Sequence, residues 1–190
     1  MAKATVVVLF ALGFLASCAA ERRAIYSAPD LAQRGIGSIQ VAAIADERPF
    51  PGAQLAIGSQ VGHALVQALS ARGYRTVSLG RAAAPAVDAV IDASAAELLA
   101  AAPAGERYLL FVSVEQIRFE LDEIGSDARV RLAAVLVDAE AREVVWRDRA
   151  EQESSIAGAG LARTSLSVPR YEAIYRTAVS LVSSLPQAAL

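Results

Sequence analysis

The fold is decided by three apolar stretches: YLLFVSVEQIRFEL at residues 108–121, RVRLAAVLV at 129–137 and EVVWRDRAE at 143–151. The first begins fully apolar and then alternates between apolar and polar side chains, which predicts a strand buried at its start and half-exposed later. Polar segments at 122–127 and 138–142 separate the stretches and predict turns. Three strands with such short connections predict an antiparallel meander.

The segments before the meander alternate between strand and helix patterns. Residues 38–45 (SIQVAAIA) predict a strand that ends in the polar segment 46–49. From about residue 55 to 72 apolar side chains recur at helical spacing, and Gly73 stands where a C-terminal cap belongs. A short strand at 75–79 follows. This order predicts an amphipathic helix packed on a sheet.

The remaining helices lie on either side of the meander. Within the alanine-rich segment 81–102 the better helix candidate is 93–102, while 86–92 is compatible with either helix or strand. Residues 167–185 give the clearest amphipathic pattern, with Pro169 near the start, where its missing N–H does no harm. The predicted order β-α-β-α-β-β-β-α indicates an α/β fold. We expect a mixed sheet of about five strands with helices packed on it.

The N-terminus has the three-part build of an export signal. Lys3 supplies a positive start, residues 5–15 are apolar, and Ala16-Ser17 form a small-residue junction. The apolar part is shorter than the roughly 20 residues needed to span a bilayer. It ends at Cys18, which is the only cysteine of the chain, so no disulfide can form within it.

The four residues Leu15-Ala16-Ser17-Cys18 resemble the lipobox of bacterial lipoproteins. The resemblance implies that the Cys18 thiol receives a lipid and that Cys18 then becomes the N-terminus. It also implies that Ala19 sends the protein to the periplasmic face of a Gram-negative outer membrane. The alternative is an ordinary signal peptide cut after Ala20, with an incidental cysteine.

Three regions follow from this interpretation. Residues 1–17 are a signal peptide, residues 18–37 show no sustained period and predict a tether, and residues 38–190 form one α/β domain. The net charge of the whole chain is -2, and its arginines are spread along the sequence. This charge pattern argues against nucleic-acid binding.

The sequence lacks the usual catalytic and cofactor motifs. His63 is the only histidine and lies on the polar face of its predicted helix, so a multi-histidine metal site is excluded. The glycine pairs at 35–37 and 158–160 lack the strand-to-helix setting of a phosphate loop. One acidic cluster lies in a predicted turn, where we expect it to be solvated rather than hydrolytic or calcium-binding: Asp122, Glu123 and Asp127. We expect no enzymatic activity and no cofactor.

Two segments carry a family resemblance, YLLFVSV at 108–114 and AAVLVDAEAREVVW at 133–146. With the first strand and a long helix ending at Gly73-Tyr74, they resemble the TolB amino-terminal domain, the periplasmic part of CsgG and related neisserial surface lipoproteins. The resemblance covers about residues 38–153. The family turn often carries glycine, whereas this chain has Ala139-Glu140-Ala141-Arg142. The resemblance implies an accessory lipoprotein that contacts other envelope proteins.

The leading hypothesis is therefore a non-enzymatic interaction or assembly module, held at the outer membrane through Cys18. We expect a periplasmic or outer-membrane protein partner, with a homo-oligomer as a further option, and strand 115–121 and loop 46–54 as candidate contacts. A second hypothesis is a carrier of a lipid or small molecule in an alanine-lined groove. A third, a hydrolase, would require two carboxylates facing each other in a cleft.

Overall fold

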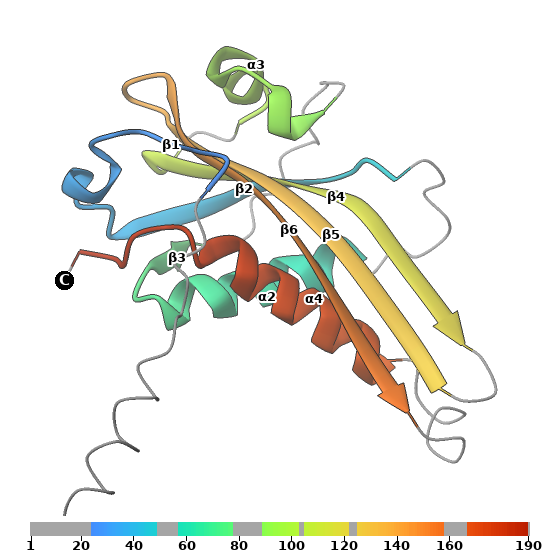
Figure 1. The fold of residues 1–190 in the computed structure, drawn as a ribbon. Helices are drawn as coiled ribbons and strands as arrows, with labels where there is room; N and C mark the ends of the chain where they lie inside the picture. Colours follow the sequence, from blue (N-terminus) through green and yellow to red (C-terminus); the bar gives the residue numbers. More distant parts are fainter. Residues whose placement is uncertain are drawn as a thin grey trace, which may run out of the picture.

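The computed structural model describes residues 24–48, 57–77, 89–102, 105–121, 125–157 and 167–189. Its strands are β1 (Tyr26–Ser27), β2 (Ser38–Asp46), β3 (Arg75–Val77), β4 (Tyr108–Leu121), β5 (Gly125–Asp138) and β6 (Glu143–Ala157). Its helices are η1 (Leu31–Arg34), α2 (Ile57–Ala71), η2 (Val90–Asp92), α3 (Ala95–Ala100) and α4 (Ser167–Val182). The strands form one sheet in the order β1-β6-β5-β4-β2-β3, with helices on both faces (Figure 1). The predicted α/β class is confirmed, with six strands rather than about five.

The sheet is mixed, and the predicted meander is confirmed. β2 runs parallel to β3 and to β4, whereas β4, β5 and β6 are antiparallel. Their pairing continues to Leu121↔Ser126 and Gly125↔Ala157, so β5 and β6 are longer than the sequence predicted. Asp127, placed in a turn by the sequence pattern, pairs with Glu120 inside the ladder. Cross-strand ion pairs on this part of the sheet explain why a polar sequence continues as strand.

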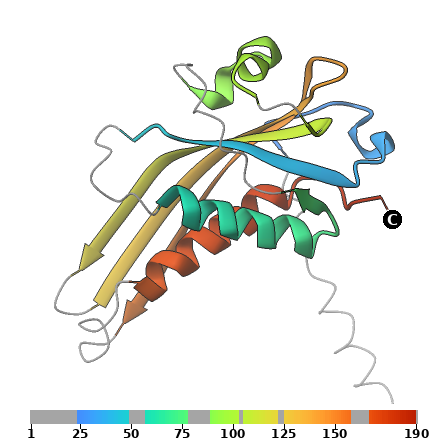
Figure 2. The same ribbon diagram turned by 180° about the vertical axis from the view of Figure 1, so that it is seen from behind.

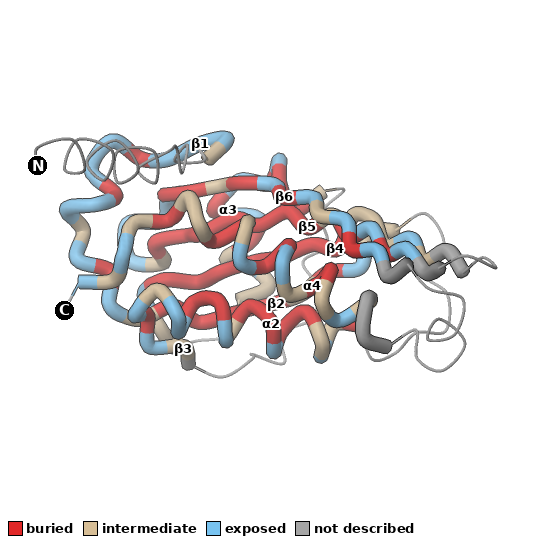
Figure 3. Tube along the Cα trace, turned by 60° about the horizontal axis from the view of Figure 1, so that its bottom comes forward, coloured by how far each residue is buried: buried red, intermediate tan, exposed pale blue. Residues whose placement is uncertain are grey.

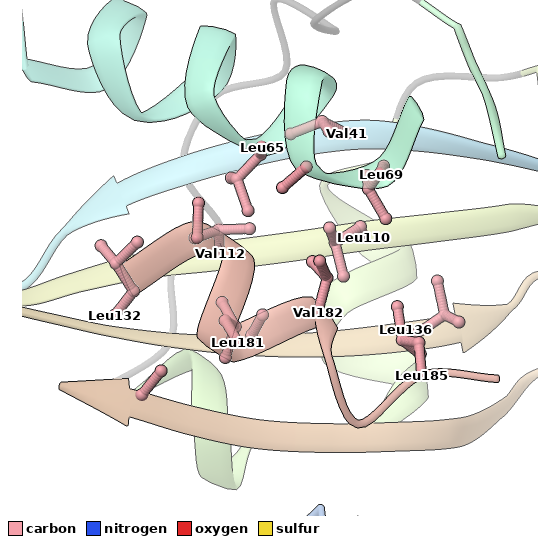
Figure 4. Close-up of a cluster of buried hydrophobic side chains, with 14 of the residues drawn as sticks. Val41, Leu65, Leu69, Leu110, Val112, Leu132, Leu136, Leu181, Val182 and Leu185 are labelled. Atoms are coloured by element: carbon pink, nitrogen blue, oxygen red, sulfur yellow. The ribbon is translucent and has the colours of Figure 1, made fainter. Parts of the chain in front are cut away.

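One face of the sheet is covered by α2 and α4, which lie side by side along it (Figures 1 and 3). Buried and exposed residues recur in turn along each helix (Figure 3), and the buried ones belong to the same core cluster as residues of the strands. In Figure 4, Leu65 and Leu69 of α2 and Leu181 of α4 lie against leucines and valines of the strands. Fully burying one such side chain contributes about 1.5–3 kcal/mol. This layer is the main core of the protein.

The opposite face carries a smaller layer of η2 and α3 (Figure 2). Val90, Ile91 and Leu98 are buried against Leu109 and Phe111 of β4. α3 has only six residues and is held by a capping box, in which Ser94 and Glu97 bond each other's backbone N–H. This layer lies over one end of the sheet, and β4, β5 and β6 extend well beyond it (Figure 1).

The N-terminal part of the chain packs against the domain earlier than expected. β1 pairs with β6, and Ala28, Leu31 and Ile36 are buried in the main core. The tether expected over residues 18–37 is therefore wrong from residue 24 onward. Sequence periodicity could not find this segment because its strand has two residues and its buried side chains follow no repeat.

A buried carboxylate stands two residues after the fully buried Trp146. It belongs to Asp148, which lies on the same side of β6 as Trp146. The Trp146 Nε1–H donates to Ser184 Oγ at 3.1 Å, and Ser184 Oγ donates to Asp148 Oδ2 at 2.7 Å. This chain of hydrogen bonds joins β6 to the turn that follows α4.

In the β5–β6 turn an arginine stands at a position whose backbone conformation favours glycine. Arg142 has φ +57°, and it is the only non-glycine residue with positive φ in the described part of the chain. A side chain in this left-handed region costs about 1–2 kcal/mol, because Cβ crowds the backbone. Glycine avoids that cost.

We expect Arg142→Gly to raise the free energy of unfolding by about 1 kcal/mol, through relief of this strain. Urea denaturation of the folded domain would measure the change. Ala141→Gly is the control in the same turn, because Ala141 has no positive φ, and it should lower stability or leave it unchanged. Equal effects of the two glycines would contradict the strain argument.

Candidate functional site

The predicted lipidation residue, Cys18, lies outside the described residues. Of the candidate loop 46–54 the structure describes only Asp46, Glu47 and Arg48. Arg48 pairs with Asp46, and Glu47 accepts a hydrogen bond from the Val90 backbone at 2.7 Å. Glu47 thus fastens the end of β2 to the small helical layer.

The other candidate contact, strand 115–121, belongs to a projecting three-stranded unit. We call the unit formed by residues 115–121, 125–131 and 149–157 the ribbon. Its inner face packs on α4, where Arg170 lies over the ring of Phe119 and Gln152 donates to Ser180. Among the described elements none covers its outer face, because α3 and η2 end over the other part of the sheet (Figures 1 and 2).

The outer face of the ribbon carries ion pairs between its strands. Arg131 Nη2 lies 2.6 Å from Glu151 Oε2, and Arg129 Nη2 lies 2.7 Å from Glu153 Oε2. At the base of the ribbon, Arg149 Nη2 lies 2.7 Å from Glu115 Oε1, and this carboxylate raises the pKa of the Arg149 guanidinium. The first two pairs join the neighbouring strands β5 and β6, and the third reaches from β6 to β4 across β5. We call this set of ion pairs the lattice; pairs between strands favour a single register.

The acidic cluster predicted from the sequence is only partly described. Asp127 lies on this outer face and, with Arg118, Arg129 and Glu153, lines a hollow of about 80 Å³. That volume is far below the 300 Å³ or more typical of a ligand pocket. No group of three or more metal-ligating side chains occurs among the described residues, and the exposed His63 stands on the outer side of α2.

A wider groove lies between the end of α3 and the β5–β6 turn, with a volume of about 390 Å³. Leu99, Ala102, Leu109 and Ala139 contribute apolar surface to it. Four of its nine lining residues are charged, namely Glu106, Arg107, Glu140 and Arg142. Its size suits a small ligand, but its charged lining does not suit the apolar ligand of the carrier hypothesis.

Asp138, at the start of the β5–β6 turn, is fully buried and joins three parts of the chain. Its Oδ2 lies 2.8 Å from Arg107 Nη2 and 3.3 Å from Arg34 Nη1. Its Oδ1 accepts hydrogen bonds from the backbone N–H groups of Glu140 and Ala141, both at 3.1 Å. Burial raises the pKa of the Asp138 carboxyl, but the bonds from Arg107 and the turn amides outweigh it and leave the pKa below its ordinary value.

Arg34 extends this network to the N-terminal segment. Its guanidinium pairs with Asp30 at 3.0 Å and with Glu143 at 2.6 Å, and these carboxylates raise its pKa. The sequence resemblance included the valine-aspartate end of this strand but assigned no role to Asp138. The only signal for that role was a single acidic residue after an apolar strand, which any turn could carry.

Comparison with known proteins gives structural matches only. No family model matches the chain, and no curated protein matches it. Its fold is similar to that of a point variant of PelC, a dodecamer from Paraburkholderia phytofirmans, with 22% identity over 86% of this chain and 96% of that one and a TM-score of 0.50.

Two further similar structures are lipoproteins. Lipoprotein GNA1162 from Neisseria meningitidis is 18% identical over 70% of this chain and 94% of that one, with a TM-score of 0.42. A minor lipoprotein from Acinetobacter baumannii is 10% identical over 80% of this chain and 98% of that one, with a TM-score of 0.39. The structures similar to this chain thus include bacterial lipoproteins, while the resemblance to TolB and CsgG stays a prediction.

We expect Asp138→Asn to lower the free energy of unfolding by about 3 kcal/mol near pH 7, because two arginines lose a buried anionic partner. The lowered pKa means that Asp138 stabilises the fold above its unfolded-state pKa of about 4, and that this stabilisation disappears as pH falls through the lower folded-state pKa.

Urea denaturation of wild type and variant between about pH 7 and pH 3 measures this difference, which should narrow as pH falls. Asp127→Asn, at an exposed carboxylate of the ribbon, is the matched control and should change stability much less. A difference between wild type and Asp138→Asn that is constant with pH would contradict the charged role of Asp138.

Proposed function

We propose that this chain is a non-enzymatic lipoprotein of the bacterial envelope, anchored through Cys18 at the periplasmic face of the outer membrane, whose domain assembles with other envelope proteins. The observation that carries the proposal is the ribbon, a projecting unit whose outer face is ordered by ion pairs and left uncovered by the described elements. An ordered and accessible strand surface suits protein binding better than catalysis.

The first partner we propose is a second copy of the chain. In the described part of the sheet β2 pairs with β4 only as far as Val114, and β1 pairs with β6 only at Trp146 and Arg147. The ribbon therefore has two strand edges without a described partner. Two different edges on one molecule allow head-to-tail contacts, which close into rings. The dodecamer named for the similar PelC structure supports such an assembly.

Lipidation is the part of the proposal that rests on the sequence. No helix among the described residues is long and apolar enough to cross a membrane. Acyl chains contribute about 0.8 kcal/mol per buried methylene, so two or three chains suffice for stable attachment. The lipobox resemblance at Leu15–Cys18 supplies the site for them.

We expect Cys18→Ser to abolish lipid attachment and to release the protein from washed outer membranes or leave it unprocessed, because the serine hydroxyl cannot replace the thiol. Fractionation followed by mass spectrometry of the N-terminal peptide measures both effects. Ala20→Ser, two residues further on, is the control and should stay lipidated and attached. A mature wild-type chain without lipid would contradict the anchor.

We expect Arg131→Glu combined with Glu151→Arg to reduce assembly, because Glu151 lies on the edge strand β6 and a second copy would meet the opposite charge there. The fold should be kept, because the cross-strand pair is restored with its charges exchanged. Native mass spectrometry and light scattering measure assembly, and urea denaturation measures stability. Exchanging the exposed pair Glu172 and Arg176 on α4 is the matched control. A monomeric wild type contradicts self-assembly, and an unchanged oligomer in the ribbon variant contradicts the ribbon interface.

A further inference from the structure

Four large apolar or aromatic side chains are exposed in the described part of the chain. Two of them, Ile25 and Tyr26, are consecutive, with exposed fractions of 58% and 43%. The other two, Tyr171 and Val179, lie two helical turns apart on α4 with exposed fractions of 39% and 40%. Exposed apolar side chains that stand singly need no explanation. Ile25 and Tyr26 differ because they are neighbours at the start of the described chain, and we call these two residues the patch.

The patch is held in place by the sheet. Tyr26 pairs with Arg147 of β6, and the Arg147 guanidinium lies 6.0 Å from the centroid of the Tyr26 ring. The same guanidinium donates to the Ile91 carbonyl at 2.9 Å. Ala28 then donates its backbone N–H to the Val145 carbonyl at 2.9 Å and is itself buried. Tyr26 and the segment directly after it are thus fastened to β6, which gives the exposed pair a fixed place on the domain.

The position of this surface relative to Cys18 limits what can cover it. Only five residues, Ala-Ala-Glu-Arg-Arg, stand between Cys18 and Ala24, the first described residue. Six steps along a fully extended chain span at most about 20 Å. A lipid on Cys18 therefore keeps Ile25 and Tyr26 close to the headgroups. Two of the five residues are arginines, which favour an anionic lipid surface.

We propose that Ile25 and Tyr26, with Arg147 beside them, form a second membrane contact that turns the β1 edge of the domain toward the lipid surface. The proposal rests on the proposed lipidation of Cys18. Tyrosine suits the boundary between headgroups and acyl chains, isoleucine suits the acyl chains, and arginine pairs with lipid phosphate. β3 is at the opposite edge of the sheet, so the contact would direct that edge away from the membrane.

The test uses full-length lipidated protein in vesicles of phosphatidylethanolamine and phosphatidylglycerol with brominated acyl chains, which quench tryptophan on contact. Tyr26→Trp places a reporter in the patch, and Tyr171→Trp places one on α4 at nearly the same exposure. The fully buried Trp146 is an internal reference that lipid should not quench. We expect the added emission of Tyr26→Trp to be largely lost, and that of Tyr171→Trp to be retained.

A second pair of variants removes the contact instead of reporting on it. Ile25→Ser in the Tyr26→Trp background should restore most of the quenched emission, whereas Val179→Ser in the same background should not. Quenching of Tyr171→Trp alone, or of neither reporter, overturns the proposed contact. The proposed contact is also overturned if brominated lipid no longer quenches Tyr26→Trp once copies of the chain associate. In that case a second copy, and not the membrane, covers the patch.

Failure of the underlying lipid anchor gives a different result from failure of the contact. If Cys18 carries no lipid, wild type does not float with the vesicles. If only the contact is wrong, wild type floats with the vesicles while the emission of Tyr26→Trp is unchanged by brominated chains.

Discussion

The structure depends on how many faces of its central strands are buried. At the start of β4, Leu110 packs on the α2–α4 layer and Phe111 on the η2–α3 layer, so the strand is apolar at every position. Further along only one face is covered, and the sequence alternates. The ladder shifts register between Val114 and Gln116, close to this change. A bulge at such a point lets the strand bend as its surroundings change. β4 thus runs from a part of the sheet that is covered on both faces into the ribbon, which is covered on one face only.

This constraint also decides what could be predicted from the sequence. Segments with a sustained pattern, such as the meander and the helix at 167–185, were found because burial imposes a period of 2 or 3.6 residues. β1 was missed because two residues show no period. The prediction ended β6 too early because Gln152, Glu153 and Ser154 are polar on both faces of the strand. Glu153 is held by its ion pair with Arg129, Gln152 donates to Ser180, and Ser154 is buried.

The candidate site was accessible to prediction only in part. The alternating pattern of strand 115–121 predicted a half-exposed strand, and the structure shows no described element over its outer face; its role as a contact stays a prediction. Asp138 and Asp148 were not identified, since their burial depends on Arg34, Arg107 and Ser184, which lie far away in the sequence. A carboxylate that is buried by distant partners leaves no local signal. The structural role of a charged residue therefore has to be determined from the contacts that surround it.

The ion pairs on the ribbon fix the register of its strands but add little to the free energy of unfolding, so we propose that they also serve recognition. Exposed pairs contribute about 0–1 kcal/mol each, because water already solvates both charges. A partner that covered the lattice would have to match every charge or leave some of them buried and unpaired, at a cost of several kcal/mol. A wrong partner or a shifted register would meet like charges. The lattice contributes little to the isolated domain, yet it would discriminate strongly between partners, which is the property that an assembly surface requires.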